Sequence, residues 1–244
     1  MEKGFTPIAG GVTAAKGFMA ASTAAGIKYS GRQDMAMIYS STPCMAAGTF
    51  TTNLVKAAPV KWDQEIVYHQ PSAQAVVINS GVANACTGSE GMECCQMTAQ
   101  EAAKVLNIEP TQVLVASTGV IGQQLPMDQI REGVRNLAPL LSGAREASAL
   151  AAQAIMTTDT VPKEVAVTVE LGGRTVTIGG MCKGSGMIHQ HVHHAQLRHH
   201  GRGHFPGNAA EGPQRCGKGY LQHGLCGRRH IQPMTRCCFG QRHG

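Results

Sequence analysis

Residues 75–88 read AVVINSGVANACTG, and this segment is the strongest indication of the fold class. Its first five residues, 75–79, form an apolar run that ends in a polar residue, which is typical of a buried β-strand. Small residues fill the remainder, 79–88, and a segment with apolar side chains at helical spacing follows over 92–106. The apolar positions of that segment are Met92, Cys95, Ala99, Ala102, Val105 and Leu106. A strand, a small-residue loop and a helix in succession indicate an α/β protein.

Further strands are expected on both sides of this unit. Residues 35–40 and Val113–Ala116 are short apolar runs bounded by polar turn residues, so we expect two more buried strands. Apolar and polar residues alternate over 165–171 and again over 176–178, with Gly172-Gly173 between them. Two alternating runs joined by a glycine pair predict a β-hairpin.

Two further helices are expected between the third strand and the hairpin. Asp128 follows Leu125-Pro126-Met127 and is a candidate N-cap for a helix that runs to about Leu141. Ser142 is a candidate cap for an alanine-rich helix through Met156. With the strands above, these helices predict a layered α/β sandwich.

Charge divides the chain into two parts. Residues 190–244 carry 8 basic and 1 acidic residues, and residues 1–189 carry 13 and 14, so the net charges are +7 and −1. Nine of the eleven histidines also lie after residue 189. The basic character therefore belongs to the tail, and the body shows no electrostatic footprint of a nucleic-acid-binding domain.

The body reads as a cytoplasmic protein. Its start, Met1-Glu2-Lys3-Gly4-Phe5, lacks the apolar core of a signal peptide, and no stretch approaches the length of a membrane span. Its cysteines have no framework spacing, which favours buried thiols in a reducing compartment. They are Cys44, Cys86, Cys94, Cys95 and Cys182.

Two glycine-containing segments are candidate sites. In 115–122 a strand runs into Thr118-Gly119, where a hydroxyl and a backbone N–H could stabilise a developing oxyanion; an ordinary strand-to-helix turn is the alternative. The loop 79–88 could bind an anion at the start of the next helix, but it matches neither a Walker A loop nor a dinucleotide fingerprint. Close backbone packing is the alternative explanation for that loop.

Two polar segments follow the alanine-rich helix. Met156-Thr157-Thr158-Asp159-Thr160 places three hydroxyls around one carboxylate, which could orient a polar substrate or simply end the helix. Lys183 lies between Gly179-Gly180 and Gly184-Ser185-Gly186. Glycines permit close ligand approach, so this lysine could reach a carboxylate or carbonyl; a solvated hairpin lysine is the alternative.

The tail allows a different function, binding of metal or nucleic acid. Its possible metal ligands are His191, His193, His194, Cys216, Cys226, Cys237 and Cys238. Zinc sites use ligand pairs at short spacing, and here most of the cysteines lie about ten residues apart, a poor match. We therefore expect no metal site, and the binding function stays an alternative to catalysis.

Taken together, these segments closely resemble one family, the bifunctional ornithine acetyltransferase/glutamate N-acetyltransferase of arginine biosynthesis. The resemblance covers residues 11–189 in family order, with one departure at Val82, where the family usually has asparagine. The matching segments are Val12–Phe18, Gly26-Ile27-Lys28, Ala57-Ala58-Pro59-Val60, 79–88, 115–122, Leu125–Asp128, Ala154–Thr160, Pro162-Lys163-Glu164 and 179–188.

The resemblance implies an acetyl transfer through a threonine acyl-enzyme. The family's precursor cuts itself before a threonine, whose hydroxyl then takes acetyl from N-acetylornithine and passes it to glutamate. Acetyl-CoA can be a donor, and no cofactor stays bound. The resemblance implies that Thr118 and Gly119 form the oxyanion hole and that Thr157 and Lys183 contact substrate. It also implies a heterotetramer of two α and two β chains, and no membrane or nucleic-acid partner.

The chain departs from the family directly after His189. The family continues with a proline and then Asn-Met-(Ala/Ser)-Thr-Met-Leu, whose threonine is the nucleophile, whereas residues 190–195 read QHVHHA. Read one base later, codons for 190–195 permit Asn-Met-Ser-Thr-Met-Leu, and codons for Leu221–Ile231 permit the family's later Asp-Gly-Asp-Thr-Ser segment. We therefore interpret 1–189 as an α-chain-like acetyltransferase domain and 190–244 as an out-of-frame, disordered tail. The chain as written lacks the nucleophile, which predicts an inactive protein.

Overall fold

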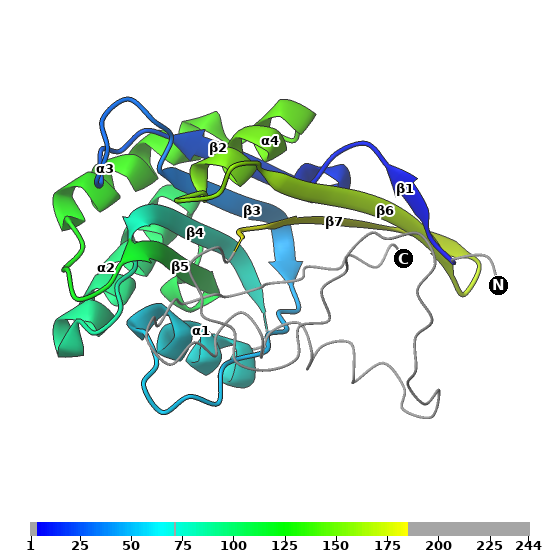
Figure 1. The fold of residues 1–244 in the computed structure, drawn as a ribbon. Helices are drawn as coiled ribbons and strands as arrows, with labels where there is room; N and C mark the ends of the chain where they lie inside the picture. Colours follow the sequence, from blue (N-terminus) through cyan, green and yellow to red (C-terminus); the bar gives the residue numbers. More distant parts are fainter. Residues whose placement is uncertain (1–3, 71, 185–244) are drawn as a thin grey trace, which may run out of the picture.

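The computed structural model describes residues 4–70 and 72–184, and these residues form two β-sheets with four α-helices (Figure 1). The strands are β1 Thr6–Ile8, β2 Phe18–Thr23, β3 Met35–Cys44, β4 Ala73–Val82, β5 Val113–Val120, β6 Lys163–Leu171 and β7 Arg174–Cys182. The α-helices are α1 Ala58–His69, α2 Gly88–Leu106, α3 Met127–Leu137 and α4 Arg145–Ala154. Short 3₁₀ turns are η1 Val12–Ala14, η2 Pro110–Gln112 and η3 Ala138–Leu140. The expected α/β sandwich is confirmed for this part; the tail 190–244 lies outside the described residues.

The larger sheet has the order β2-β3-β4-β5. Strands β2, β3 and β4 pair antiparallel, whereas β4 and β5 pair parallel from Ala75↔Val113 to Val82↔Val120. A parallel pair needs a long crossover, and α2 supplies it. The strands expected at 35–40, 75–79 and Val113–Ala116 and the helix expected at 92–106 are therefore confirmed, each somewhat longer than its apolar run.

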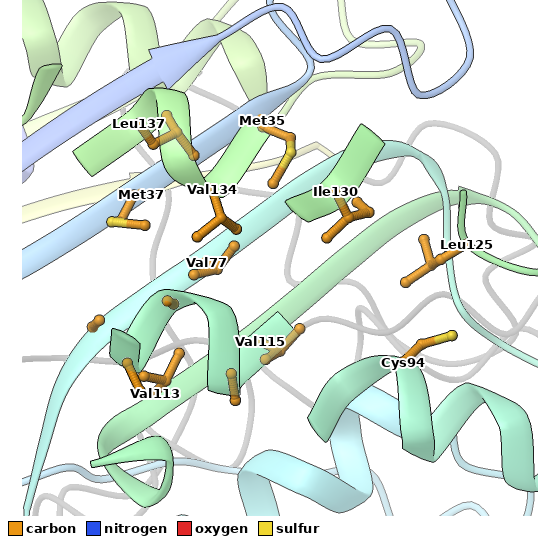
Figure 2. Packing of buried hydrophobic residues seen from close by; sticks show 14 of the residues in the cluster. Met35, Met37, Val77, Cys94, Val113, Val115, Leu125, Ile130, Val134 and Leu137 are labelled. Carbon is orange, nitrogen blue, oxygen red and sulfur yellow. The ribbon is translucent and has the colours of Figure 1, made fainter. Parts of the chain in front are cut away.

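The main core lies between one face of this sheet and helices α2 and α3 (Figure 2). Strand alternation places Val77 and Val115 on that face, and Val134 and Leu137 of α3 pack against it with full burial. The opposite face packs against α4 and, near β5, against α1. Burying one such side chain contributes about 1.5–3 kcal/mol, so both helix layers hold the sheet in place.

Both edge strands of the larger sheet are partly covered. Along β5, the Trp62 Nε1–H of α1 donates to the Val113 carbonyl (3.0 Å), and Asp63 Oδ1 accepts from the Val115 N–H (2.8 Å). Along β2, Ala20 and Ser142 exchange two backbone hydrogen bonds of 3.0 Å. These contacts pair some of the backbone groups that the two edge strands would otherwise expose.

The smaller sheet has the order β1-β6-β7 and confirms the expected hairpin. Gly172 and Gly173 form its turn with φ of 60° and 76°, the positive values that a two-residue type I′ turn requires. Val165 and Ile178 lie on the outer face of this sheet and are 60% and 49% exposed, whereas Ala166 on the other face is buried. Figure 1 shows the hairpin extending beyond the larger sheet.

The two expected helix caps are wrong. Helix α3 begins at Met127 after Pro126, so Asp128 lies in its first turn, where its charge still interacts favourably with the helix dipole. Helix α4 begins only at Arg145, because Ser142 is used to pair with β2 and its Oγ accepts from the Ala144 N–H (3.1 Å). Among the described residues, none of the helices combines the length and the apolar character that crossing a membrane requires.

Replacing Leu137 by alanine should lower the free energy of unfolding by about 2–5 kcal/mol, because the cavity lies in the core beneath α3. Leu140→Ala is the matched control: its side chain is 54% exposed, and we expect a change within about 0.5 kcal/mol. Urea unfolding followed by circular dichroism measures both. Equal losses for the two variants would contradict the placement of the core.

Candidate functional site

The first site segment lies at the carboxyl ends of the two parallel strands. Thr118 and Gly119 of β5 stand in register with Ser80 and Gly81 of β4. Gly119 has φ 137°, and a Cβ there would overlap the backbone of Gly81 and lie 2.7 Å from the Val82 nitrogen. Only glycine fits, because the two backbones approach too closely for a side chain. Thr118 is itself almost fully buried.

The loop 79–88 uses its polar groups internally. Asn84 is buried with φ 48°; its Nδ2 donates to the Gly91 carbonyl (2.8 Å), and its Oδ1 accepts from the Thr87 hydroxyl (2.8 Å). These contacts tie the loop to the first turns of α2. Asn84 Nδ2 also lies 3.3 Å from the Cys95 Sγ. The arrangement favours close packing over anion binding for this loop.

The second site segment is organised around Asp159. Its Oδ2 accepts from the Thr157 N–H (3.2 Å) and lies 3.1 Å from the Lys183 Nζ. Its Oδ1 accepts from the Gly184 N–H (2.5 Å) and lies 3.7 Å from the Lys163 Nζ. We call these five residues the Asp159 cluster. Sequence reasoning named Thr157 and Lys183 separately, and the structure joins them through this one carboxylate.

Burial and charge compete at this carboxylate. Burial alone would raise the pKa of Asp159, since its side chain is only 3% exposed. The hydrogen bonds from the Thr157 N–H, the Lys183 ammonium and the Gly184 N–H outweigh burial and lower the pKa of Asp159 below its ordinary value. The carboxylate is therefore charged at neutral pH and compensates the Lys183 ammonium.

A pocket of about 390 Å³ adjoins the cluster. One wall carries Arg32, whose Nη2 donates to the Met156 carbonyl (2.5 Å) and whose guanidinium lies 5.3 Å from the centre of the Tyr29 ring. A guanidinium fixed in this way keeps further N–H donors for an anionic group. Sequence reasoning missed Arg32, because an isolated arginine in a loop carries no spacing signal. The pocket is lined by Arg32, Gln33, Gln153, Met156, Thr157, Asp159 and Pro162.

The loop 24–34 connects the two site segments. Asp34 shapes it by accepting from the Ala25 and Ile27 N–H groups (2.7 Å each). The loop carries Arg32 at the pocket and Lys28, whose Cβ would lie 2.9 Å from a Cβ at Gly81. Nearby, the Ser80 hydroxyl donates to the Ala154 carbonyl at the end of α4 (2.8 Å). Ser80, the register partner of Thr118, thus links β4 to the end of α4 that leads into Thr157. No hydrogen bond or ion pair joins Thr118 or Gly119 to Thr157 or Lys183 in the described residues.

The described part of the chain contains no set of metal ligands. Nowhere in residues 4–70 and 72–184 do three or more histidine, cysteine, aspartate or glutamate side chains gather as metal ligands. The histidines and cysteines of the tail lie outside the described residues. The metal-binding alternative therefore keeps only the sequence argument given above.

The Asp159 pKa has a consequence for stability. A carboxyl whose pKa is lower in the folded state stabilises the fold above its unfolded pKa, about 3.9, and loses that contribution as the pH falls through the folded value. Wild type should therefore be more stable than Asp159→Asn near neutral pH, and the difference should shrink between about pH 5 and pH 2. Urea unfolding of both proteins across this range measures it. A difference independent of pH would contradict the assignment.

Comparisons with known proteins agree with the family resemblance of these segments. The family model described as "ArgJ family" matches residues 19–194. The chain is 54% identical over 187 residues to the arginine biosynthesis bifunctional protein ArgJ of Symbiobacterium thermophilum, covering 76% of this chain and 46% of the relative. It is 51% identical over 185 residues to the protein of the same name from Gloeobacter violaceus, covering 76% and 45%. The chain thus spans less than half the length of these curated relatives.

Two solved structures share the fold. The arginine biosynthesis bifunctional protein ArgJ of Bacillus halodurans superposes with a TM-score of 0.72 at 41% identity, over 76% of this chain and 96% of that chain. The ornithine acetyltransferase of Mycobacterium tuberculosis, solved in complex with ornithine, gives 0.69 at 42% identity over 76% and 97%. With the family model matching well over half of the sequence, the chain belongs to the ArgJ family.

Proposed function

We propose that this chain supplies the N-terminal half of an acetyltransferase that moves acetyl from N-acetylornithine to glutamate in arginine biosynthesis, with acetyl-CoA as a second donor and no bound cofactor. ArgJ-family proteins are acyltransferases of this pathway, and a relative has been solved with ornithine. The observation that carries the proposal is the Asp159 cluster, which joins Thr157 and Lys183. It lies beside a pocket whose wall carries the Arg32 guanidinium.

Thr157 and Lys183 contact the substrate in this proposal. Two lysines and Arg32 lie near a single carboxylate, so the region carries excess positive charge. Glutamate carries two carboxylates, and N-acetylornithine carries one. Excess positive charge at the pocket favours such carboxylate-bearing substrates.

Thr118 and Gly119 stabilise the oxyanion in this proposal. The hydroxyl of Thr118 and the N–H of Gly119 would donate to the acetyl oxygen as it gains negative charge. Gly119 packs backbone against backbone on Gly81, which supports a rigid donor that needs no rearrangement during the reaction. Preorganised donors of this kind typically contribute about 2.7–4 kcal/mol to transition-state stabilisation.

The nucleophile is a threonine in this proposal. Its hydroxyl attacks the acetyl carbonyl, its α-amine takes the proton and returns it to the leaving ornithine amine, and an acetyl ester forms. The amine of glutamate then attacks the ester, which yields N-acetylglutamate and restores the hydroxyl. Self-cleavage of the precursor exposes that α-amine and yields the α and β chains, which assemble as a cytoplasmic heterotetramer.

The lengths of the matched proteins support cleavage. The match covers 185 residues and 45% of the Gloeobacter relative, which corresponds to about 410 residues. The separate match to the solved Bacillus chain covers 76% of this 244-residue chain and 96% of that chain, whose length therefore corresponds to about 190 residues. Solved chains of this family therefore have about half the length of the curated polypeptides.

Expressed as written, this chain should neither cleave itself nor transfer acetyl, because no threonine occurs between Lys183 and Thr235. Mass spectrometry should find the intact 25.6 kDa chain, and N-acetylornithine with glutamate should yield no ornithine. The Symbiobacterium relative is the positive control. Fragments cut near residue 193 together with ornithine release would overturn the proposal, and an intact DNA frame through codon 190 would overturn the out-of-frame tail.

A chimera tests the site residues. Residues 1–188, joined to the Symbiobacterium relative from the residue that aligns with His189 onward, should transfer acetyl. In this chimera Lys183→Met should lower kcat/KM by about 10- to 100-fold, the range expected for losing a hydrogen bond from a charged donor. Lys61→Met on the exposed face of α1 is the matched control and should leave it unchanged. Equal kcat/KM for the two variants would contradict a role of Lys183 in the site.

A further inference from the structure

Asp159 occupies a junction between two distant parts of the chain. It follows α4 in the connection to β6, while two of its partners, Lys183 and Gly184, stand at the far end of β7. Its side chain is 3% exposed and contacts two backbone N–H groups and two ammonium groups. A buried carboxylate with so many donors is charged and held in one orientation.

Lys183 has one ammonium proton left for another partner. Its side chain is 8% exposed, and its Nζ donates to Asp159 Oδ2 and to the Gly184 carbonyl, each at 3.1 Å. A lysine ammonium carries three donors, so acceptors within residues 4–70 and 72–184 take two of them and leave the third for a ligand. Without the carboxylate this ammonium would be a buried charge lacking compensation, which is strongly unfavourable.

Asp159 also sets the backbone path at the end of β7. A Cβ at Gly184 would overlap Asp159 Oδ1 and lie 3.1 Å from the Lys163 Nζ. The carboxylate therefore occupies the space of a side chain at position 184 and binds the N–H there instead. The same group that holds the ammonium thus fixes the residue next to it.

We propose that Asp159 is the positioning residue for Lys183: it holds the ammonium so that its one remaining N–H meets an oxygen acceptor of the substrate, a carboxylate or an acyl carbonyl. The identity of that acceptor rests on the proposed acetyl transfer, whereas the positioning rests on the contacts of Asp159 alone. The Lys163 side chain is 44% exposed, and its Nζ lies 3.7 Å from Asp159 Oδ1. Lys163 is therefore a secondary, outer partner of the carboxylate.

The variant Asp159→Asn removes the charge and one acceptor oxygen. Asparagine has nearly the same shape, and its Oδ1 can still accept from the Gly184 N–H, so the backbone path at the end of β7 is kept. The Thr157 N–H loses its acceptor, and the ion pair with Lys183 is lost. Exposed Asp128, in the first turn of α3, gives the matched control Asp128→Asn. A purely structural role for Asp159 would leave the reactivity of Lys183 unchanged in the asparagine variant.

Competitive acetylation of the purified chain with acetic anhydride measures that reactivity. Mass spectrometry gives the labelling of Lys183 relative to Lys61, which is exposed on α1. In Asp159→Asn this ratio should rise about tenfold or more, the factor expected when a charged hydrogen bond is lost, while Asp128→Asn should match wild type. An unchanged ratio in an Asp159→Asn protein with native circular dichroism would overturn the proposal.

A measurement on wild type keeps the test decisive if Asp159→Asn fails to fold. Ammonium protons held in buried ion pairs exchange slowly with water, so the ¹⁵N–¹H signal of the Lys183 side chain should persist near neutral pH, when exposed lysines lose theirs. Lys183→Arg assigns the signal. Absence of a persistent signal would overturn the proposal. Neither readout requires acetyl transfer, so failure of the positioning role and failure of the proposed function are distinguishable.

Discussion

The parallel pairing of β4 with β5 determines where the helices and the candidate site lie. Two parallel neighbours need a crossover, which places α2 on one face of the sheet and brings α3 against it. The pairing also makes β5 an edge strand, whose backbone groups α1 then binds through Trp62 and Asp63. Finally, it aligns Gly81 with Gly119 at the carboxyl ends, the kind of edge at which open α/β sheets present their ligand sites.

Much of this framework could be predicted from local sequence. The buried runs at 75–79 and Val113–Ala116 and the helical spacing over 92–106 are patterns that packing alone produces. The glycine pair between two alternating strands also predicted a single structure, a hairpin turn. Helix α1 and strands β1 and β2 were missed. Helix α1 buries Pro59, Asp63 and Ile66 at helical spacing, but a proline and an aspartate among these positions interrupt the apolar pattern. Strand β2 is recognisable mainly through its partners.

The site was predictable only in part. Thr157 and Lys183 were named as separate candidates, but nothing in the sequence shows that Asp159 joins these two residues, which are 26 positions apart. That contact depends on the β6–β7 hairpin returning the chain to the end of α4. Arg32 shows the same limit, because its place beside Met156 is set by how Asp34 folds the loop 24–34. The error at Ser142 has a similar origin, since pairing with β2 outweighed a local capping preference.

Coverage of both edges of the larger sheet also bears on how the chain associates at high concentration. Edge strands with unpaired backbone groups are the usual starting points for strand-by-strand aggregation. In the described part of the chain, α1 and Ser142 hinder that route at β5 and β2, whereas no described strand lies beside β7 in the smaller sheet. Among the described residues, strand addition is therefore less hindered at the smaller sheet, whose outer face presents Val165 and Ile178 to solvent.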